Sequence, residues 1–67
     1  MKTVIERIVE AQDYLNIAMS LMHLKDARER NGLWNDEEQE TINRNIEMNL
    51  TEARDNINLA ILIVEDW

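Results

Sequence analysis

Few residues of this 67-residue chain have the type and spacing that chemistry requires. The only histidine is His23, and its neighbours on the same strip of a predicted helix are Asn16, Ser20 and Ala27, which offer neither a second metal ligand nor a nucleophile. The chain contains no cysteine, which excludes a Cys/His zinc set and a disulfide. We therefore interpret His23 as a surface residue without a catalytic role.

Two carboxylate pairs stand at helical spacing, Glu37-x-x-Glu40 and Glu52-x-x-Asp55. They resemble the E-x-x-E and E-x-x-D elements of the all-α MazG-like nucleotide pyrophosphatases, which bind magnesium between helices. A site of that kind takes its carboxylates from different helices, whereas Glu40 and Glu52 share one predicted helix and lie about 18 Å apart along it. A third pair, Glu10 and Asp13, points away from the expected packing stripes. The pairs are interpreted as solvated faces, and the sequence predicts no metal, no cofactor and no enzymatic activity.

Acidic residues outnumber basic residues by 14 to 7, which gives a formal net charge of −7. This balance repels a phosphate backbone and withholds the lysine and arginine contacts on which nucleic-acid binding depends. The charge therefore argues against a direct nucleic-acid ligand, and it would attract a protein partner with a basic surface. The interpretation that we prefer is that net acidity only keeps a small protein in solution.

The longest apolar run, residues 59–64, is far shorter than the ~20 residues of a membrane span. Charged residues within the first ten positions leave no uninterrupted apolar stretch for a signal peptide. The lack of cysteine fits a reducing compartment. We expect a cytoplasmic protein with no membrane association.

Helical periodicity is interrupted once, around Gly32, which is the only glycine in a chain without proline. Thr3 and Glu6 form a predicted capping box at the start of the first helix. Gly32 is expected to supply the left-handed residue that ends this helix, and Asn35 or Asp36 caps the second.

The chain is therefore predicted to be one all-α domain over residues 1–67, an antiparallel two-helix hairpin with helices at about 3–31 and 36–66 and a turn at 32–35. Chains this short bury too little surface to be comfortably stable alone, so we expect the hairpin to dimerise into a four-helix bundle. This shape is similar to that of the Rop family of plasmid RNA-binding hairpin dimers. The similarity covers the architecture, and the charge of −7 argues against an RNA-binding face.

One apolar stripe on each helix is expected to form the core of the hairpin. Its members are Val4, Ile8, Ala11, Leu15, Ala18, Met19 and Met22 on the first helix, and Ile46, Leu50, Ala53, Ile57, Ala60, Val64 and Trp67 on the second. The second set follows a 4-3 spacing, which predicts left-handed coiled-coil packing, and the alanines allow the backbones to approach closely.

A second set of apolar residues lies outside this stripe. It comprises Tyr14, Ile17, Leu21 and Leu24 on the flank and back of the first helix, and Leu59, Leu62 and Ile63 near the end of the second. Because two helices cannot bury both sets, we interpret the second set as an interface with another copy or a partner, and Trp34 at the turn joins it as a candidate anchor. The alternative is that residues 59–63 only cover the open end of the hairpin and that Trp34 staples the second helix.

Asn49 and Asn56 lie one heptad apart at the edge of the predicted core stripe. Buried asparagines at such positions fix register and oligomeric state, because a misaligned partner leaves an amide unpaired. The alternative, which the sequence supports equally, is that both are half-exposed flanking residues.

These patterns predict a binding protein rather than an enzyme. The leading hypothesis is a small acidic protein-binding module of the kind by which phages inhibit a host enzyme or defence complex through stoichiometric binding. One alternative is a structural or adaptor subunit of a larger assembly. Another is a binder of nucleotide-type small ligands in a pocket at a subunit interface.

Overall fold

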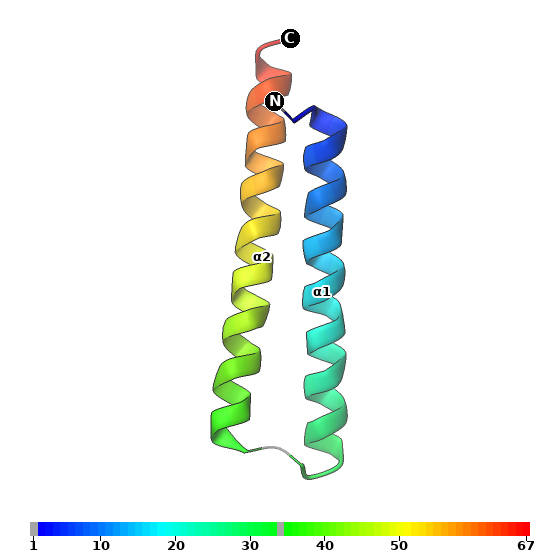
Figure 1. Cartoon of the computed structure of the whole chain (residues 1–67), viewed down its shortest axis with the longest axis vertical. Coiled ribbons are helices and arrows are strands. Elements are labelled where there is room, and N and C mark those ends of the chain that lie inside the picture. The colour runs from blue at the N-terminus through cyan, green and yellow to red at the C-terminus, as the bar shows by residue number, and fades with distance from the viewer. Residues whose placement is uncertain (1, 34) are drawn as a thin grey trace.

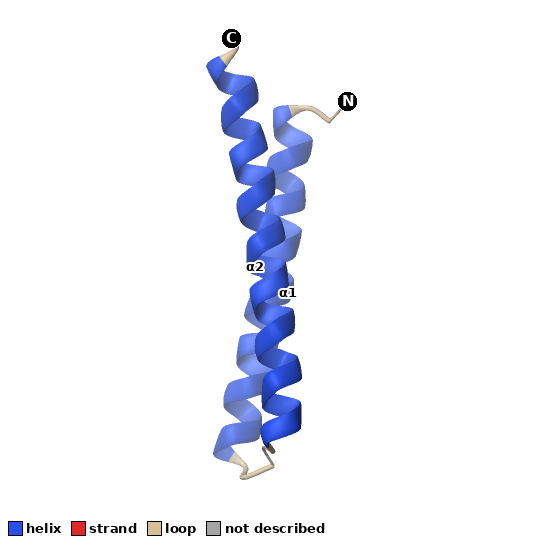
Figure 2. Cartoon of the chain, turned by 90° about the vertical axis from the view of Figure 1, so that its left-hand side faces the viewer, coloured by secondary structure: helices blue, strands red, loops and turns tan. Residues whose placement is uncertain are grey.

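Two long helices make up the fold in the computed structural model, which describes residues 2–33 and 35–67. Helix α1 (Val4–Arg30) and helix α2 (Asp36–Glu65) run side by side and antiparallel (Figure 1). In the view turned by 90° the two ribbons cross near their middle (Figure 2), and the molecule measures 51 × 16 × 15 Å. The predicted all-α hairpin is confirmed. Neither helix has a stretch long and apolar enough to cross a membrane within the described residues.

Helix α1 begins with the predicted capping box. The backbone N–H of Glu6 donates to Thr3 Oγ1 over 3.1 Å, and the backbone N–H of Thr3 donates back to Glu6 Oε1 over 3.2 Å. Two N–H groups that the first helical turn cannot satisfy are thus paired, and the Glu6 carboxylate lies where the helix dipole favours an anion.

The end of α1 is a Schellman turn built on Gly32. The backbone N–H of Leu33 donates to the carbonyl of Arg28 over 3.0 Å, and that of Gly32 donates to the carbonyl of Glu29 over 3.3 Å. Gly32 has φ of 65°, so the predicted left-handed residue is confirmed. Leu33 is 65% exposed, however, and buries little of the apolar contact that often accompanies this turn.

Helix α2 is capped by Asn35, the first of the two candidates from the sequence. Its Oδ1 atom accepts from the backbone N–H of Glu38 over 2.8 Å. Acidic residues Asp36, Glu37 and Glu38 fill the first turn, where the helix dipole stabilises negative charge. Glu38 also accepts from Arg28 Nη1 over 2.7 Å, which ties the two helices together beside the turn.

One row of residues from each helix, at 3-4 spacing, forms the contact between the helices, which we call the seam. The row is Val4, Arg7, Ala11, Tyr14, Ala18, Leu21, Lys25 and Arg28 on α1, and Gln39, Ile42, Ile46, Asn49, Ala53, Asn56, Ala60 and Ile63 on α2; all are buried or half-buried. Among the described residues only Ala11, Ala18, Ala53, Ala60 and Asn56 are fully buried. The hairpin therefore has a thin core of small side chains.

The structure corrects the predicted core stripe. Its four alanines are buried as expected, but most of its large members are between 38% and 83% exposed: Ile8, Leu15, Met19, Met22, Leu50, Ile57, Val64 and Trp67. Each helix is rotated so that the row containing Tyr14 and Asn56, rather than the row containing Leu15 and Ile57, meets the other helix. Trp67 was predicted to continue the core, but it follows the end of α2 and is 83% exposed.

Candidate interaction surface

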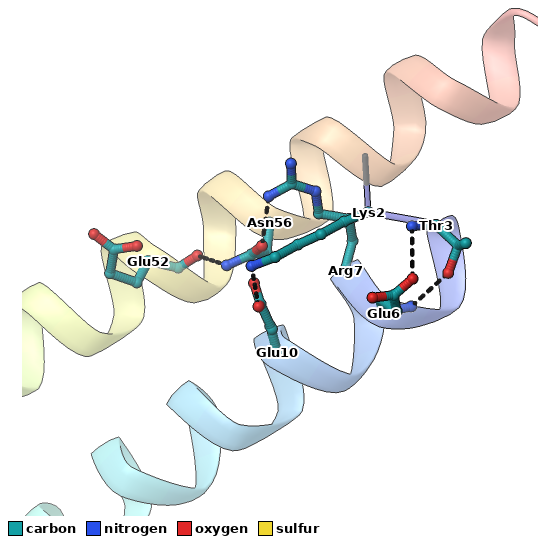
Figure 3. Close-up of polar contacts among 7 residues, drawn as sticks. All are labelled: Lys2, Thr3, Glu6, Arg7, Glu10, Glu52 and Asn56. Atoms are coloured by element: carbon teal, nitrogen blue, oxygen red, sulfur yellow. Dashed lines mark hydrogen bonds and ion pairs between the residues drawn. The ribbon is translucent and has the colours of Figure 1, made fainter.

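A polar contact lies inside the seam near the open end of the hairpin (Figure 3). Asn56 is buried, its Oδ1 atom accepts from Arg7 Nη1 over 3.3 Å, and its Nδ2 atom donates to the carbonyl of Glu52 over 3.0 Å. The first interpretation of the two asparagines, burial in a seam, therefore holds for Asn56, and this seam lies within the hairpin. Asn49 is half-buried and donates to the carbonyl of Asn45 over 2.7 Å.

The residues predicted as an interface divide into two groups. Tyr14, Leu21 and Ile63 are half-buried members of the seam, so the expectation that they lie away from the hairpin contact is wrong. Four others are exposed: Ile17, Leu24, Leu59 and Leu62. Trp34 lies outside the described residues.

Large apolar residues line one side of the seam. We call these residues the apolar face: Ile8, Leu15, Met22, Leu50, Ile57 and Val64. Each comes one position after a seam residue, namely Arg7, Tyr14, Leu21, Asn49, Asn56 and Ile63. Their spacing is seven residues on both helices, so they form two straight rows when the helices pack as a coiled coil. All six are 38% to 45% exposed.

The apolar face is one surface to which both helices contribute. Ile8 of α1 and Ile57, Val64 and Ala60 of α2 line a single pocket of about 240 Å³. Because the helices are antiparallel, seven residues forward from Ile8 on α1 correspond to seven residues back from Ile57 on α2. Leu15 therefore lies level with Leu50. Nearer the turn, the next residues at the same seven-residue spacing are the polar Glu29 and Asn43. The apolar face therefore covers the part of the hairpin away from the turn.

The opposite side of the seam has a different character. Seven residues on this side each come one position before a seam residue, and we call them the mixed face. They are Glu10, Ile17, Leu24, Glu38, Asn45, Glu52 and Leu59, which precede Ala11, Ala18, Lys25, Gln39, Ile46, Ala53 and Ala60. Successive residues of a helix are about 100° apart, so a residue before a seam position and a residue after one point to opposite sides.

Negative charge accompanies the apolar residues of the mixed face. Three glutamates and no lysine or arginine belong to it. Glu10 pairs with Lys2 and Glu38 with Arg28, while Glu52 is exposed. Leu62 lies next to this face, one turn beyond Leu59, and is 59% exposed. The mixed face thus combines apolar anchors with acidic side chains.

The residues considered for metal chemistry lie apart from one another. His23 is exposed. Glu40 accepts from Arg44 over 3.3 Å and Asp55 from Arg54 over 3.4 Å, so each carboxylate is held by a neighbouring cation. Across residues 2–33 and 35–67, no three histidine, cysteine or acidic side chains come together as a metal site.

The sequence interpretation missed the apolar face because it assigned those residues to the hairpin core. The sequence does contain a signal for the correct contact. The predicted core stripe and the seam row share the same alanines, but only the seam row also contains Arg7, Asn49 and Asn56. Polar side chains that can pair across the helices favour that stripe as the contact, since buried polar groups must be hydrogen-bonded.

Comparison of the chain with known protein families, with curated proteins and with solved structures finds no match. The predicted similarity to the Rop family is therefore not supported by these comparisons.

Proposed function

We propose that this protein is a protein-binding module, built as a four-helix bundle of two hairpins, that acts by stoichiometric binding of a partner with a basic surface. One observation carries the proposal: seventeen large hydrophobic residues are exposed in the described chain, while the hairpin core consists of four alanines and one asparagine. Six of them form the apolar face, and contiguous apolar surface of this kind marks sites of protein association.

The exposed area of the hairpin supports association. Its accessible surface is 5194 Å², whereas a compact monomer of 8.0 kDa exposes about 4,450 Å². The excess of roughly 700 Å² is close to the ~800 Å² that each partner contributes to a standard protein interface. A single further helical surface packed on the hairpin would account for it.

The charge of the chain supports a basic partner. The net charge is −7, and the mixed face presents Ile17, Leu24 and Leu59 among glutamates. Apolar anchors supply most of the free energy of binding, and complementary charge raises the rate of encounter and rejects acidic partners. This combination is what a small acidic inhibitor needs to engage the basic groove or active-site rim of a larger enzyme.

The experiment is photo-cross-linking from the mixed face in the cells that produce the protein. A benzophenone amino acid replaces Leu24, and the control carries it at Asn16, an exposed residue of the same helix. We expect one protein to be cross-linked from position 24 only, and the purified partner to bind at a fixed ratio in calorimetry. Its affinity should fall several-fold when salt rises from about 50 to about 300 mM.

Two other outcomes are informative. A cross-linked partner whose affinity does not change with salt would favour the alternative of a permanent structural subunit, because apolar contacts are weakly affected by ionic strength. No specific cross-link from position 24 would contradict a binding role for the mixed face.

A further inference from the structure

The apolar face and the mixed face differ in what can cover them. We propose that a second copy of this chain packs on the apolar face, so that the dimer displays the mixed face twice, on opposite sides of the bundle. This inference rests on the proposed function and deepens it, because it separates the surface for self-association from the surface for the partner.

Symmetry favours a second copy on the apolar face. Both helices carry the same seven-residue repeat there, and Leu15 and Leu50 lie level with each other. A two-fold axis through such a surface brings each apolar row against a row of the same kind in the other copy, which is the self-complementarity that an isologous dimer requires. The occupant therefore needs no sequence other than this one.

The size of the side chains fits a bundle core. Along each helix the half-exposed large residues of the apolar face alternate with buried alanines, as Ile8, Ala11, Leu15 and Ala18 do on α1. Alanines let the helices approach closely, and large residues in the next layer fill the space toward the opposing hairpin. The stripe that the sequence assigned to a two-helix core thus becomes the core of four helices.

Charge excludes the mixed face as the dimer contact. Glu10 and Glu38 are paired with Lys2 and Arg28, but a two-fold axis there would bring the exposed Glu52 of both copies into one interface, where like charges repel each other. The six residues of the apolar face carry no charge, and the one acidic residue that lines its pocket, Glu65, lies at the last position of α2. A second copy is therefore favoured on the apolar face and disfavoured on the mixed face, which stays free for a basic partner.

This arrangement makes the protein bivalent. Two mixed faces on opposite sides of one bundle can hold two partner molecules, or two sites of one oligomeric partner. In the second case, binding at the first site raises the effective concentration at the other and strengthens the complex without any new contact.

The test is sedimentation equilibrium of two matched double variants. Leu15→Glu with Leu50→Glu changes the apolar face, and Leu24→Glu with Leu59→Glu changes the mixed face; both pairs place one substitution on each helix and add two negative charges. The four leucines are similarly exposed, between 39% and 43%. We expect the wild type and the mixed-face variant to be dimers of twice 8.0 kDa, and the apolar-face variant to dimerise roughly 100-fold more weakly.

A measurement on the unaltered protein covers the case in which the apolar-face variant fails to fold. Isotope-filtered NMR on a mixture of labelled and unlabelled chains reports contacts between copies. We expect intermolecular contacts from the methyl groups of Leu15, Leu50 and Ile57. A monomeric wild type, or contacts from Leu24 and Leu59 instead, would overturn the inference.

Failure of this inference is distinguishable from failure of the proposed function. A wild type that binds its cross-linked partner as a monomer would refute self-association through the apolar face, and with it the four-helix bundle, but keep the binding role. A dimer through the apolar face with no cross-linked partner would do the reverse.

Discussion

The guanidinium of Arg7 donates a hydrogen bond across the two helices to Oδ1 of Asn56, 3.3 Å away, although the residues are 49 positions apart in the chain. Both residues belong to the row of their helix that faces the other helix. Rotating either helix to bring Leu15 and Ile57 inward would bury more apolar surface but would separate the two polar groups. In the observed rotation Asn56 is buried, and leaving its amide unpaired would cost about 1–3 kcal/mol, so the hydrogen bond links the two helices at this point.

A double-mutant cycle measures that link. Asn56→Ala is expected to reduce the free energy of unfolding by about 1–3 kcal/mol, because it leaves Arg7 without its acceptor in a half-buried position. Arg7→Ala and the double variant complete the cycle, and the coupling energy should be about 0.5–1.5 kcal/mol. Urea unfolding at one protein concentration gives all four values. Strict additivity of the two substitutions would show that the hydrogen bond contributes nothing to stability.

Gly32→Ala tests the turn. Gly32 has φ of 65° and an added Cβ would meet no atom within 4 Å, so the substitution creates backbone strain without a steric clash. We expect a loss of about 1–2 kcal/mol in the free energy of unfolding. Gly32→Asn is the control, since asparagine tolerates left-handed backbone better than other residues with a side chain. Equal stability of the wild type and the alanine variant would contradict a strained backbone at this position.

Asn35→Ala tests the cap of α2. The substitution removes the oxygen that accepts from the Glu38 N–H over 2.8 Å, and it should lower the free energy of unfolding by about 0.5–2 kcal/mol. Asn58→Ala, also an exposed Asn-to-Ala change but inside α2 and away from both caps, should leave stability unchanged or raise it slightly, because alanine has the higher helix propensity. If both variants lost the same stability, the cap would not be the cause.

Dilution tests whether folding and association are coupled. If the apolar face is covered by a second copy, the melting temperature of the wild type must rise with protein concentration, because association stabilises the folded state by mass action. Circular dichroism melts over a hundredfold range of concentration should show a shift of several degrees. The Leu15→Glu and Leu50→Glu variant should lose that dependence. A constant melting temperature in the wild type would mean that the hairpin is stable alone.

The hairpin and its ends are readable from the sequence because they depend on local rules. The capping box of Thr3 and Glu6, the left-handed Gly32 and the cap at Asn35 each follow from the backbone groups that a helix end leaves unsatisfied. Those groups lie within a few residues of the side chains that satisfy them. No tertiary information is needed to place them.

The rotation of the two helices was not predictable in the same way. Two overlapping stripes contain the same alanines, and the more apolar stripe, with Leu15 and Ile57, is the natural choice for a core. The stripe that meets the other helix is the one that contains Arg7 and Asn56, whose contact joins residues far apart in the sequence. The apolar face follows from that rotation, for which the polar residues Arg7, Asn49 and Asn56 of one stripe are a signal in the sequence.

The position of the small-residue core has a consequence for how the chain folds. Contacts beside the turn, such as Arg28 with Glu38, close a loop of few residues, whereas Arg7 with Asn56 closes one of 49. The longer closure costs about 1.4 kcal/mol more entropy, yet the buried Asn56 and three of the four buried alanines, Ala11, Ala53 and Ala60, lie toward that far end. The Arg28–Glu38 contact beside the turn is polar and partly exposed, whereas most of the fully buried residues come into contact only when the longer loop closes. The hairpin is therefore not expected to fold by closing residue by residue from its turn. Its two helices gain stability when they dock along most of their length in one concerted step.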